Sequence, residues 1–329
     1  YLELSEEGDK NGNYHIESFF ELIKSYENPD KEVYCSLSNH YGSDDEFEKQ
    51  DDLITNVREN EDNYELDFNF KTPINDQSKL EIGYDGRFFY SKENMDFELP
   101  GLKGINDFNM IRNIHGFFIE YQLELNEKFS IKPSYRIEYV DKKIEFLKKS
   151  DEITSDISSY AQYLNEIGDS TVNINEINNF PDLHFTYNIT DKRSIQLGIS
   201  RRIERPGGGS HGSWGQLRPF PRNVYNDSFI FLGNVFLKPE FSTQYEISYK
   251  GPMPMGFFYT NLYYRDVTNS IEWYDFDGEN NDIPTNIITF KNADAATDLG
   301  IELFMMIMGQ TLGGGYNVNE LNDSSNDFQ

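Results

Sequence analysis

Apolar and polar residues alternate along residues 181–203, and the same alternation returns along much of the chain. In this segment the apolar side chains occupy every second position: Leu183, Phe185, Tyr187, Ile189, Ile195, Leu197 and Ile199. A period of two places them on one face of a β-strand and the intervening polar residues on the other face. The junction Thr190-Asp191-Lys192 has room only for a tight reversal, so the segment is predicted to be a β-hairpin.

The alternation predicts about twelve strands in all. Those outside the hairpin are expected at about residues 14–26, 32–42, 63–71, 79–90, 117–125, 129–140, 241–250, 256–275 and 285–307, with a further strand beginning at 312–319. Short turns alternate with long connections that are interpreted as loops: 43–61, 92–111, 146–179 and 204–240. This alternation is typical of an up-and-down transmembrane barrel, which has short turns at one rim and long loops at the other.

The predicted fold class is therefore all-β, a large antiparallel transmembrane β-barrel, of which residues 1–329 form part of a single domain. The polar phase mixes Glu, Lys, Arg, Gln, Asn and Ser, a set that is costly to bury in a dry core and suits a wet lumen. With about twelve strands present, the complete barrel is expected to be wide enough to need a plug, and this chain to be roughly its C-terminal half or more.

Composition excludes some classes of partner. The net charge of −28 disfavours nucleic acid, because phosphate groups repel such a surface. Mean hydropathy is −0.68, and no stretch is long and apolar enough for a transmembrane helix, which leaves strands with one apolar face. Much of the acid lies in 42–52 and 275–282, interpreted as solvated loops. The single cysteine, Cys35, can form no intrachain disulfide and is expected to be buried or lipid-facing.

Five motifs follow one another in the second half of the chain: SRRIERP at 200–206, QLRPF at 216–220, GNVFLKPEF at 233–241, LYYRDVTNSIE at 262–272 and NADAATDLGIEL at 292–303. Their order and spacing resemble the C-terminal half of the barrel in TonB-dependent outer-membrane receptors, and are most similar to the Bacteroidetes-type outer-membrane β-barrel family. The segment 63–87 fits the same family less specifically, and the resemblance covers about residues 14–306.

The resemblance implies a plugged barrel in the cell outer membrane that binds a scarce ligand outside and imports it with energy relayed by an inner-membrane TonB complex. The partners it implies are outer-membrane lipid and a small-molecule, glycan or peptide ligand, and whether a surface lipoprotein accompanies the barrel stays open. The plug and the TonB-contacting segment normally precede the barrel. Because the chain opens on YLELSEEGDK, without an initiator Met or a signal peptide, it is expected to be an internal piece of a longer protein.

Three departures from the family pattern fall in one expected outer loop. Gly207–Ser213 is inserted after the SRRIERP motif, and Arg218 replaces the asparagine of a QLNPF-like motif. Val235 stands where a proline is expected and is followed by an extra Phe236. These departures bear on the identity of the ligand rather than on the fold.

Candidate ligand-contacting residues cluster around the same loop: Arg201, Arg202, Arg205, His211, Trp214, Arg218 and Arg222. Guanidinium groups can clamp an anionic or sugar ligand by bidentate hydrogen bonds, and aromatic rings can stack on it. The alternative is that these arginines pair with neighbouring lumen carboxylates and hold the loop. Lys238-Pro239-Glu240 is interpreted as the entry to a strand, and 275–282 as a hairpin tip rather than a calcium loop.

No catalytic motif stands out, so an enzyme is not expected, and neither is a cofactor or a bound metal. The five histidines are scattered, with no nucleophile motif and no metal-spaced His/Cys set. The main alternative is a secreted or surface-attached carbohydrate-binding module, such as a lectin-like sandwich. A barrel lipase or protease would need a Ser/His/Asp-type set in its loops or lumen.

Overall fold

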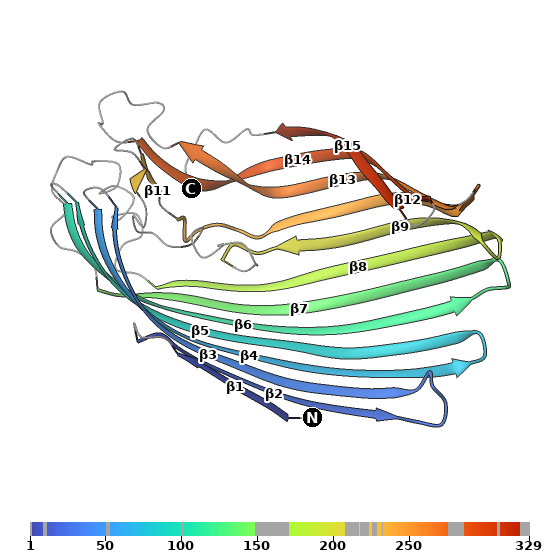
Figure 1. Ribbon diagram of the computed structural model, residues 1–329, viewed down its shortest axis with the longest axis horizontal. Coiled ribbons are helices and arrows are strands. Elements are labelled where there is room, and N and C mark those ends of the chain that lie inside the picture. The colour runs from blue at the N-terminus through green and yellow to red at the C-terminus, as the bar shows by residue number, and fades with distance from the viewer. Residues whose placement is uncertain are drawn as a thin grey trace.

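The computed structural model describes residues 2–8, 12–50, 53–99, 102–148, 171–207, 217, 224–225, 229–231, 233–254, 256–275, 286–307 and 310–322. Its regular elements are fifteen β-strands that belong to one sheet (Figure 1). The strands are β1 (Leu2–Gly8), β2 (Tyr14–Ser25), β3 (Glu32–Gln50), β4 (Leu53–Asn75), β5 (Ser78–Leu99), β6 (Leu102–Glu124), β7 (Phe129–Lys148), β8 (Val172–Thr190), β9 (Arg193–Glu204), β10 (Val224–Tyr225), β11 (Phe229–Phe231), β12 (Glu240–Met253), β13 (Gly256–Asp275), β14 (Asn286–Ile307) and β15 (Gln310–Asn322).

Strands that follow one another in the chain lie side by side and run antiparallel from β1 to β9. Strand β9 then pairs with β12, and the antiparallel run continues through β13 and β14 to β15. The short strand β11 pairs in parallel with the start of β14. This meander of long strands confirms the predicted fold class, an antiparallel outer-membrane-type barrel wall.

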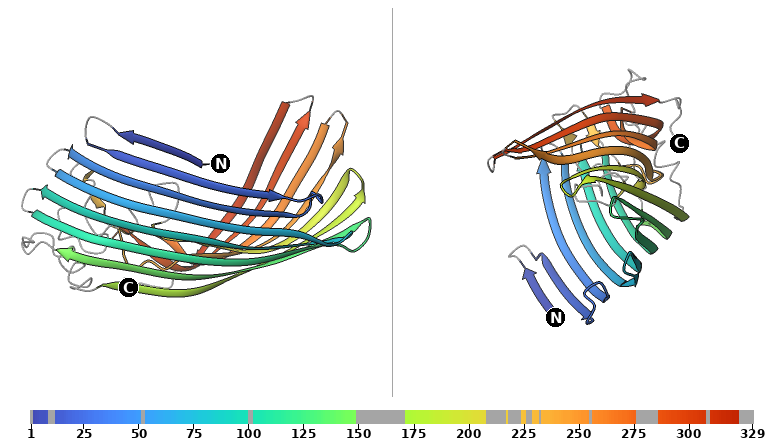
Figure 2. Two further views of the ribbon diagram at one scale, coloured as in Figure 1. Left: turned by 90° about the horizontal axis from the view of Figure 1, so that it is seen from below. Right: turned by 90° about the vertical axis from the view of Figure 1, so that its right-hand side faces the viewer.

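The sheet is curved like part of a barrel wall, and its N-terminal and C-terminal edges stay apart (Figure 2). Within the described part of the chain, β1 pairs with β2 alone and β15 with β14 alone. The two edges therefore leave the wall open, as expected for part of a larger barrel. In the same part of the chain there is no helix of the length and apolarity needed to cross a bilayer.

The two faces of the sheet are covered to very different extents. On one face the apolar phase is open, and Ile119 and Leu262 keep 48% and 47% of their surface exposed. On the other face polar side chains are covered, and Ser36 and Glu138 are only 4% and 5% exposed. A soluble protein buries the first kind of residue and exposes the second. The distribution therefore indicates that something other than water covers the apolar face.

The polar face is the concave one. Arg112 on β6 donates from Nη1 to the carbonyl oxygen of Gly207, beyond the end of β9, at 3.0 Å. Strands β7 and β8 lie between these two residues in the sheet, so the contact has to cross the inside of the curve. Polar side chains on this face converge and cover one another, whereas those on the convex face spread apart.

The open apolar positions form a band near the short turns, here called the outward apolar band. It comprises the convex-face residues within 64–70, 80–88, 117–123, 131–139, 181–187, 195–199, 245–249, 258–264 and 299–305. Its strand segments are seven to nine residues long in most cases, near the length that a tilted strand needs to cross a bilayer.

Three segments predicted to be long loops contain strands in their described residues. Strands β3 and β4 continue through 43–61, β5 and β6 continue through 92–111, and β7 and β8 take up both ends of 146–179. The parts beyond the outward apolar band, here called the strand extensions, are 42–50, 53–62, 90–99, 102–113, 141–148 and 172–179. The acidic stretch at 42–52 is thus largely strand as well, and not the solvated loop that was expected.

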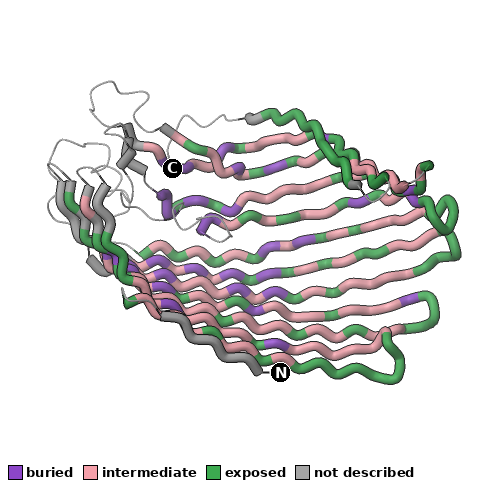
Figure 3. Tube along the Cα trace, viewed as in Figure 1, coloured by how far each residue is buried: buried purple, intermediate pink, exposed green. Residues whose placement is uncertain are grey.

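Part of the error has a physical cause, which is that the apolar phase changes face along β5, β6 and β7. On β6 the outward apolar residues end near Phe117, and from there the apolar residues Ile114, Met110 and Phe108 point inward. These three are at most 5% exposed and form a small core on the concave face with Met95, Val140 and Ile144. Buried positions accordingly gather toward the strand extensions (Figure 3). A prediction that looks for one continuous apolar face therefore ends the strand at the residue where the apolar side chains change face.

The GNVFLKPEF and NADAATDLGIEL motifs hold the start of β12 against β13 and β14. Asn234 donates to the carbonyl oxygen of Phe290 at 3.0 Å, and Asn292 donates to that of Lys238 at 2.9 Å. Asn269, which has a positive φ of 55°, donates to the carbonyl oxygen of Pro239 at 3.3 Å. Strand β12 begins at Glu240, as predicted, so these motif residues serve to anchor the chain.

Candidate functional site

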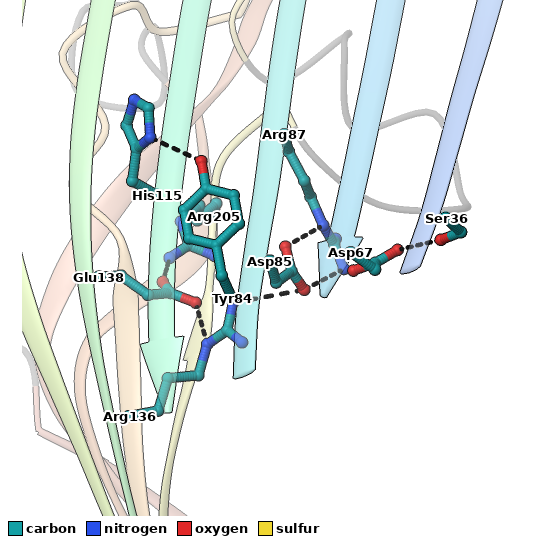
Figure 4. A network of polar contacts seen from close by, with 9 residues as sticks. All are labelled: Ser36, Asp67, Tyr84, Asp85, Arg87, His115, Arg136, Glu138 and Arg205. Atoms are coloured by element: carbon teal, nitrogen blue, oxygen red, sulfur yellow. Dashed lines mark hydrogen bonds and ion pairs between the residues drawn. The ribbon is translucent and has the colours of Figure 1, made fainter. Parts of the chain in front are cut away.

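A chain of ion pairs crosses the concave face from β5 to the end of β9 (Figure 4). Arg87 contacts Asp85 at 3.2 Å, and Arg136 reaches the same carboxylate at 3.4 Å. Arg136 also contacts Glu138 at 2.6 Å, and the second oxygen of Glu138 pairs with Arg205. Each carboxylate is thus shared by two guanidinium groups, a charge-assisted arrangement that fixes the side chains.

Gly116 makes this network possible. Arg136 lies on β7 and Asp85 on β5, so the arginine has to pass over β6, which lies between them. A Cβ atom at Gly116 would lie 2.3 Å from Nη2 of Arg136. Glycine is therefore required here for close approach, and not for a special backbone angle.

Other polar pairs extend this surface to both sides of the network. Ser36 donates to Asp67 at 3.3 Å, Asn69 donates to Glu81 at 2.6 Å, and His184 lies 3.0 Å from Asp182. A wall of paired charges and amides would be unfavourable against a dry core, but it suits contact with water or with a polar ligand. The concave face is therefore the surface on which a ligand can be bound.

The structure places the three described candidate arginines in three different surroundings. Arg205 belongs to the ion-pair network, and Arg202 contacts Asp182 at 3.3 Å with its side chain 66% exposed. Arg201 lies on the convex face, where its guanidinium is 4.7 Å from the ring centre of Phe241. The pairing of Arg202 and Arg205 with carboxylates matches the structural alternative given for them. Four candidates lie outside the described residues: His211, Trp214, Arg218 and Arg222.

Histidine and carboxylate side chains also meet at the N-terminal side of the concave face. The two nitrogens of His40 lie 3.2 Å from Glu17 and 3.3 Å from Glu61, and its ring stacks on that of His15. Burial, and then the charge of Glu59, raises the pKa of Glu61. In the described part of the chain there is no group of three or more His, Cys, Asp or Glu side chains arranged to hold a metal ion.

Sequence reasoning missed this histidine pair and two further cations on the same face, Arg112 and Lys142. The signal for His15 and His40 was the register of the first hairpin, which places the two residues on neighbouring strands and one phase. Arg112 and Lys142 lie in the strand extensions, which were interpreted as loops or as the ends of strands. Without the strand, their shared face could not be seen.

Comparison with protein families gives one match. Residues 18–319 match the model of a family described as outer membrane protein beta-barrel family. A search of curated proteins found no match.

Solved structures with a similar fold include two receptors and a transporter. The ferric yersiniabactin uptake receptor FyuA from Yersinia pestis matches with a TM-score of 0.63 and 11% identity over 95% of this chain and 43% of that one. The copper transporter OprC matches with 0.64 and 12% identity over 97% and 48%. The alcaligin outer-membrane receptor FauA from Bordetella pertussis matches with 0.59 and 14% identity over 95% and 47%. At these identities the likeness concerns the fold, and the chain spans less than half the length of each receptor.

Proposed function

Because the chain belongs to the outer membrane protein beta-barrel family, we propose that it is the barrel part of a TonB-dependent receptor that imports a scarce ligand across the outer membrane. The ligand is bound on the outer side, and the concave face forms the wall of its passage. Import on this route depends on binding and on the energy relayed by the TonB complex, not on catalysis by the chain itself.

The observation that carries this proposal is the inverted burial of the two faces. Apolar residues such as Leu197 and Leu299 are 48% and 53% exposed, whereas Glu138 and Asn178 on the concave face are 5% and 8% exposed. Lipid covers the first set at no cost, and a hydrated passage accepts the second. A lectin-like sandwich would instead bury its apolar face against a second sheet, and the described strands form one sheet.

The finer parts of the proposal rest on the motifs. The five motifs from SRRIERP to NADAATDLGIEL support a receptor of the Bacteroidetes type, in which a surface lipoprotein can cover the barrel. The structural neighbours include receptors named for ferric yersiniabactin and for alcaligin, and a transporter named for copper. Arg202 and Arg205 are proposed as ligand contacts from the concave side, and the four undescribed candidates remain predictions with them.

The experiment that tests the proposal uses the full-length protein in its own cells. Cell fractions are separated, and the membrane fraction is run on gels with and without boiling, because a folded barrel migrates differently from the unfolded chain. We expect outer-membrane enrichment and a heat-dependent shift, and growth on a scarce nutrient that is lost when the gene is deleted or the TonB complex is inactivated. A soluble protein without a mobility shift would overturn the proposal in favour of the secreted module.

A further inference from the structure

Two cations lie directly opposite each other on the concave face. The register of β6 and β7 pairs Arg112 with Lys142. Side chains in such a pair start about 5 Å apart at Cβ, and like charges placed there are destabilising. Lys142 is only 7% exposed, so water does little to screen the repulsion. The arrangement is unfavourable, although the chain has a net charge of −28 and therefore many carboxylates that could have paired with these cations.

The surroundings of the pair offer little compensation. The inward neighbours along the two strands are Met110, Ile114, Val140 and Ile144, and none is more than 5% exposed. Arg112 donates to the carbonyl oxygen of Gly207 at 3.0 Å and lies over the ring of Phe89 at 5.5 Å. Within the described part of the chain, neither Arg112 nor Lys142 has a carboxylate within ion-pair distance.

A third cation, Arg205, faces the same place. Its Nη2 pairs with Glu138, but its Nε is buried and has no hydrogen-bond partner. Burial, and then the charges of Arg205 and Arg87, lowers the pKa of Arg112 to about 10. Burial and the charge of Arg112 lower the pKa of Lys142 to about 8, although Glu176 acts in the opposite direction. Arg112 is therefore repelled by Arg205 on one side and by Lys142 on the other, with apolar side chains next to it on the same face.

A purely structural role explains this cluster poorly. Apolar replacements of a buried charged group are often neutral or stabilising, so a fold alone has no need of Lys142. The chain has 57 acidic residues, yet none of the described ones forms an ion pair with Arg112 or Lys142. An external anion would relieve the repulsion and supply an acceptor for Nε of Arg205.

We propose that Arg112, Lys142 and Arg205 form a binding site for an anionic group, a carboxylate or a phosphate, on the imported ligand. The site lies on the concave face, just beyond the outward apolar band. This inference rests on the proposed function, since it names the chemical class of the ligand that the receptor takes. Guanidinium and ammonium groups around one oxyanion give short, charge-assisted hydrogen bonds.

The test measures anion binding to the full-length protein purified in detergent, by calorimetric titration with citrate and, separately, with inorganic phosphate. Maltose is the uncharged control. We expect saturable binding of at least one anion, and the stronger of the two indicates whether the ligand carries carboxylate or phosphate. Lys142→Gln should weaken it about tenfold, the loss of one charge-assisted contact.

The matched control is Lys143→Gln, the next residue along β7. Lys143 lies on the convex face, where it pairs with Glu145, so its replacement should leave anion binding unchanged. Lys142→Arg keeps the charge and should retain binding. The heat-dependent gel shift shows that each variant is folded. Lys142→Met should raise the melting temperature and weaken anion binding at least as much as Lys142→Gln does.

Three results would overturn the inference: no binding of either anion to the wild-type protein, equal binding by Lys142→Gln, or an equal loss in Lys143→Gln. Binding to purified protein does not depend on energy or on uptake. Anion binding with no uptake in cells would therefore contradict the proposed import but support the anion site. Uptake in cells without anion binding would support the import and contradict the anion site.

Discussion

The two halves of strand β6 use opposite faces for their apolar side chains. Between 117 and 123 the apolar residues Phe117, Ile119, Tyr121 and Leu123 point outward from the curve, and Ile119 is 48% exposed. Between 108 and 114 the buried apolar residues Phe108, Met110 and Ile114 point inward, and Met110 is 0% exposed. The backbone and the pairing are the same in both halves. The comparison shows that the medium around each half, lipid in one and water in the other, decides which face is apolar.

The largest expected effect comes from a charge placed on the outward apolar band, which tests whether lipid covers this part of the strand. Ile119→Lys places an ammonium group near the middle of the band, where a cation on the lipid face costs about 3 kcal/mol. We expect a smaller free energy of unfolding, that is, a less stable protein, in urea titrations of protein refolded into lipid vesicles. Asn113→Lys is the control, because residue 113 is on the same face but beyond the band and should change stability by less than about 1 kcal/mol.

The small core of the strand extensions offers the reverse test. Met110→Ala removes a fully buried side chain from the concave face and should cost about 2 kcal/mol, at the low end for such truncations. Hydrogen exchange should rise in 102–113 and 141–148 while the band keeps its protection. If exchange rose equally along the whole sheet, the two halves would not be separate units of stability.

The charges inside the extensions predict a pH effect. The pKa of Lys142 is lowered to about 8 in the folded chain, so the unfolded chain binds more protons above that pH. Stability should therefore be lowest below pH 8 and rise by about 1 kcal/mol between pH 7 and pH 9. Denaturant titrations across this range check it. Lys142→Met should flatten this rise, whereas Lys143→Met should leave it in place.

The smallest expected effect concerns the ion-pair network on the concave face. Gly116→Ala places a Cβ atom against Arg136 and should separate the guanidinium group from Asp85. The loss of stability should be only about 0.5 kcal/mol, because the end of the arginine can move. Gly314→Ala on β15 is the control, since a Cβ there meets nothing within 4 Å. A structure of the Gly116→Ala variant with the contact between Arg136 and Asp85 intact would contradict the role given to the glycine.

The fold was predictable from the sequence wherever one face stays apolar along a strand. Residues 63–71, 117–125 and 181–203 alternate cleanly, and the structure has strands there in the expected pairing order. The predicted loop at 92–111 failed because apolar residues there move to the other phase, whereas the one at 43–61 failed because the segment is mostly acidic and polar. Short strands β10 and β11 and the first strand β1 were also missed, since two to seven residues carry too little pattern.

The candidate site was predictable only in part. Arg202 and Arg205 do lie on the concave side with carboxylates, but Arg201 is on the convex face although it is next in sequence to Arg202. Alternation implies this separation, because neighbouring residues in a strand point to opposite faces. Arg112 and Lys142 could not be found from sequence, since 30 positions separate them and only the β6–β7 register brings them together.

The sequence by itself determined the strand pattern, the family and the outer-membrane setting, because period-two alternation and the motif order are local properties of the chain. The tertiary structure alone decided which face is concave and which charges meet across strands. These depend on register and curvature, which arise from the whole sheet and not from any one strand. Arg136 reaches Asp85 over Gly116 only because three strands align, and Arg112 faces Lys142 only because of the register between β6 and β7.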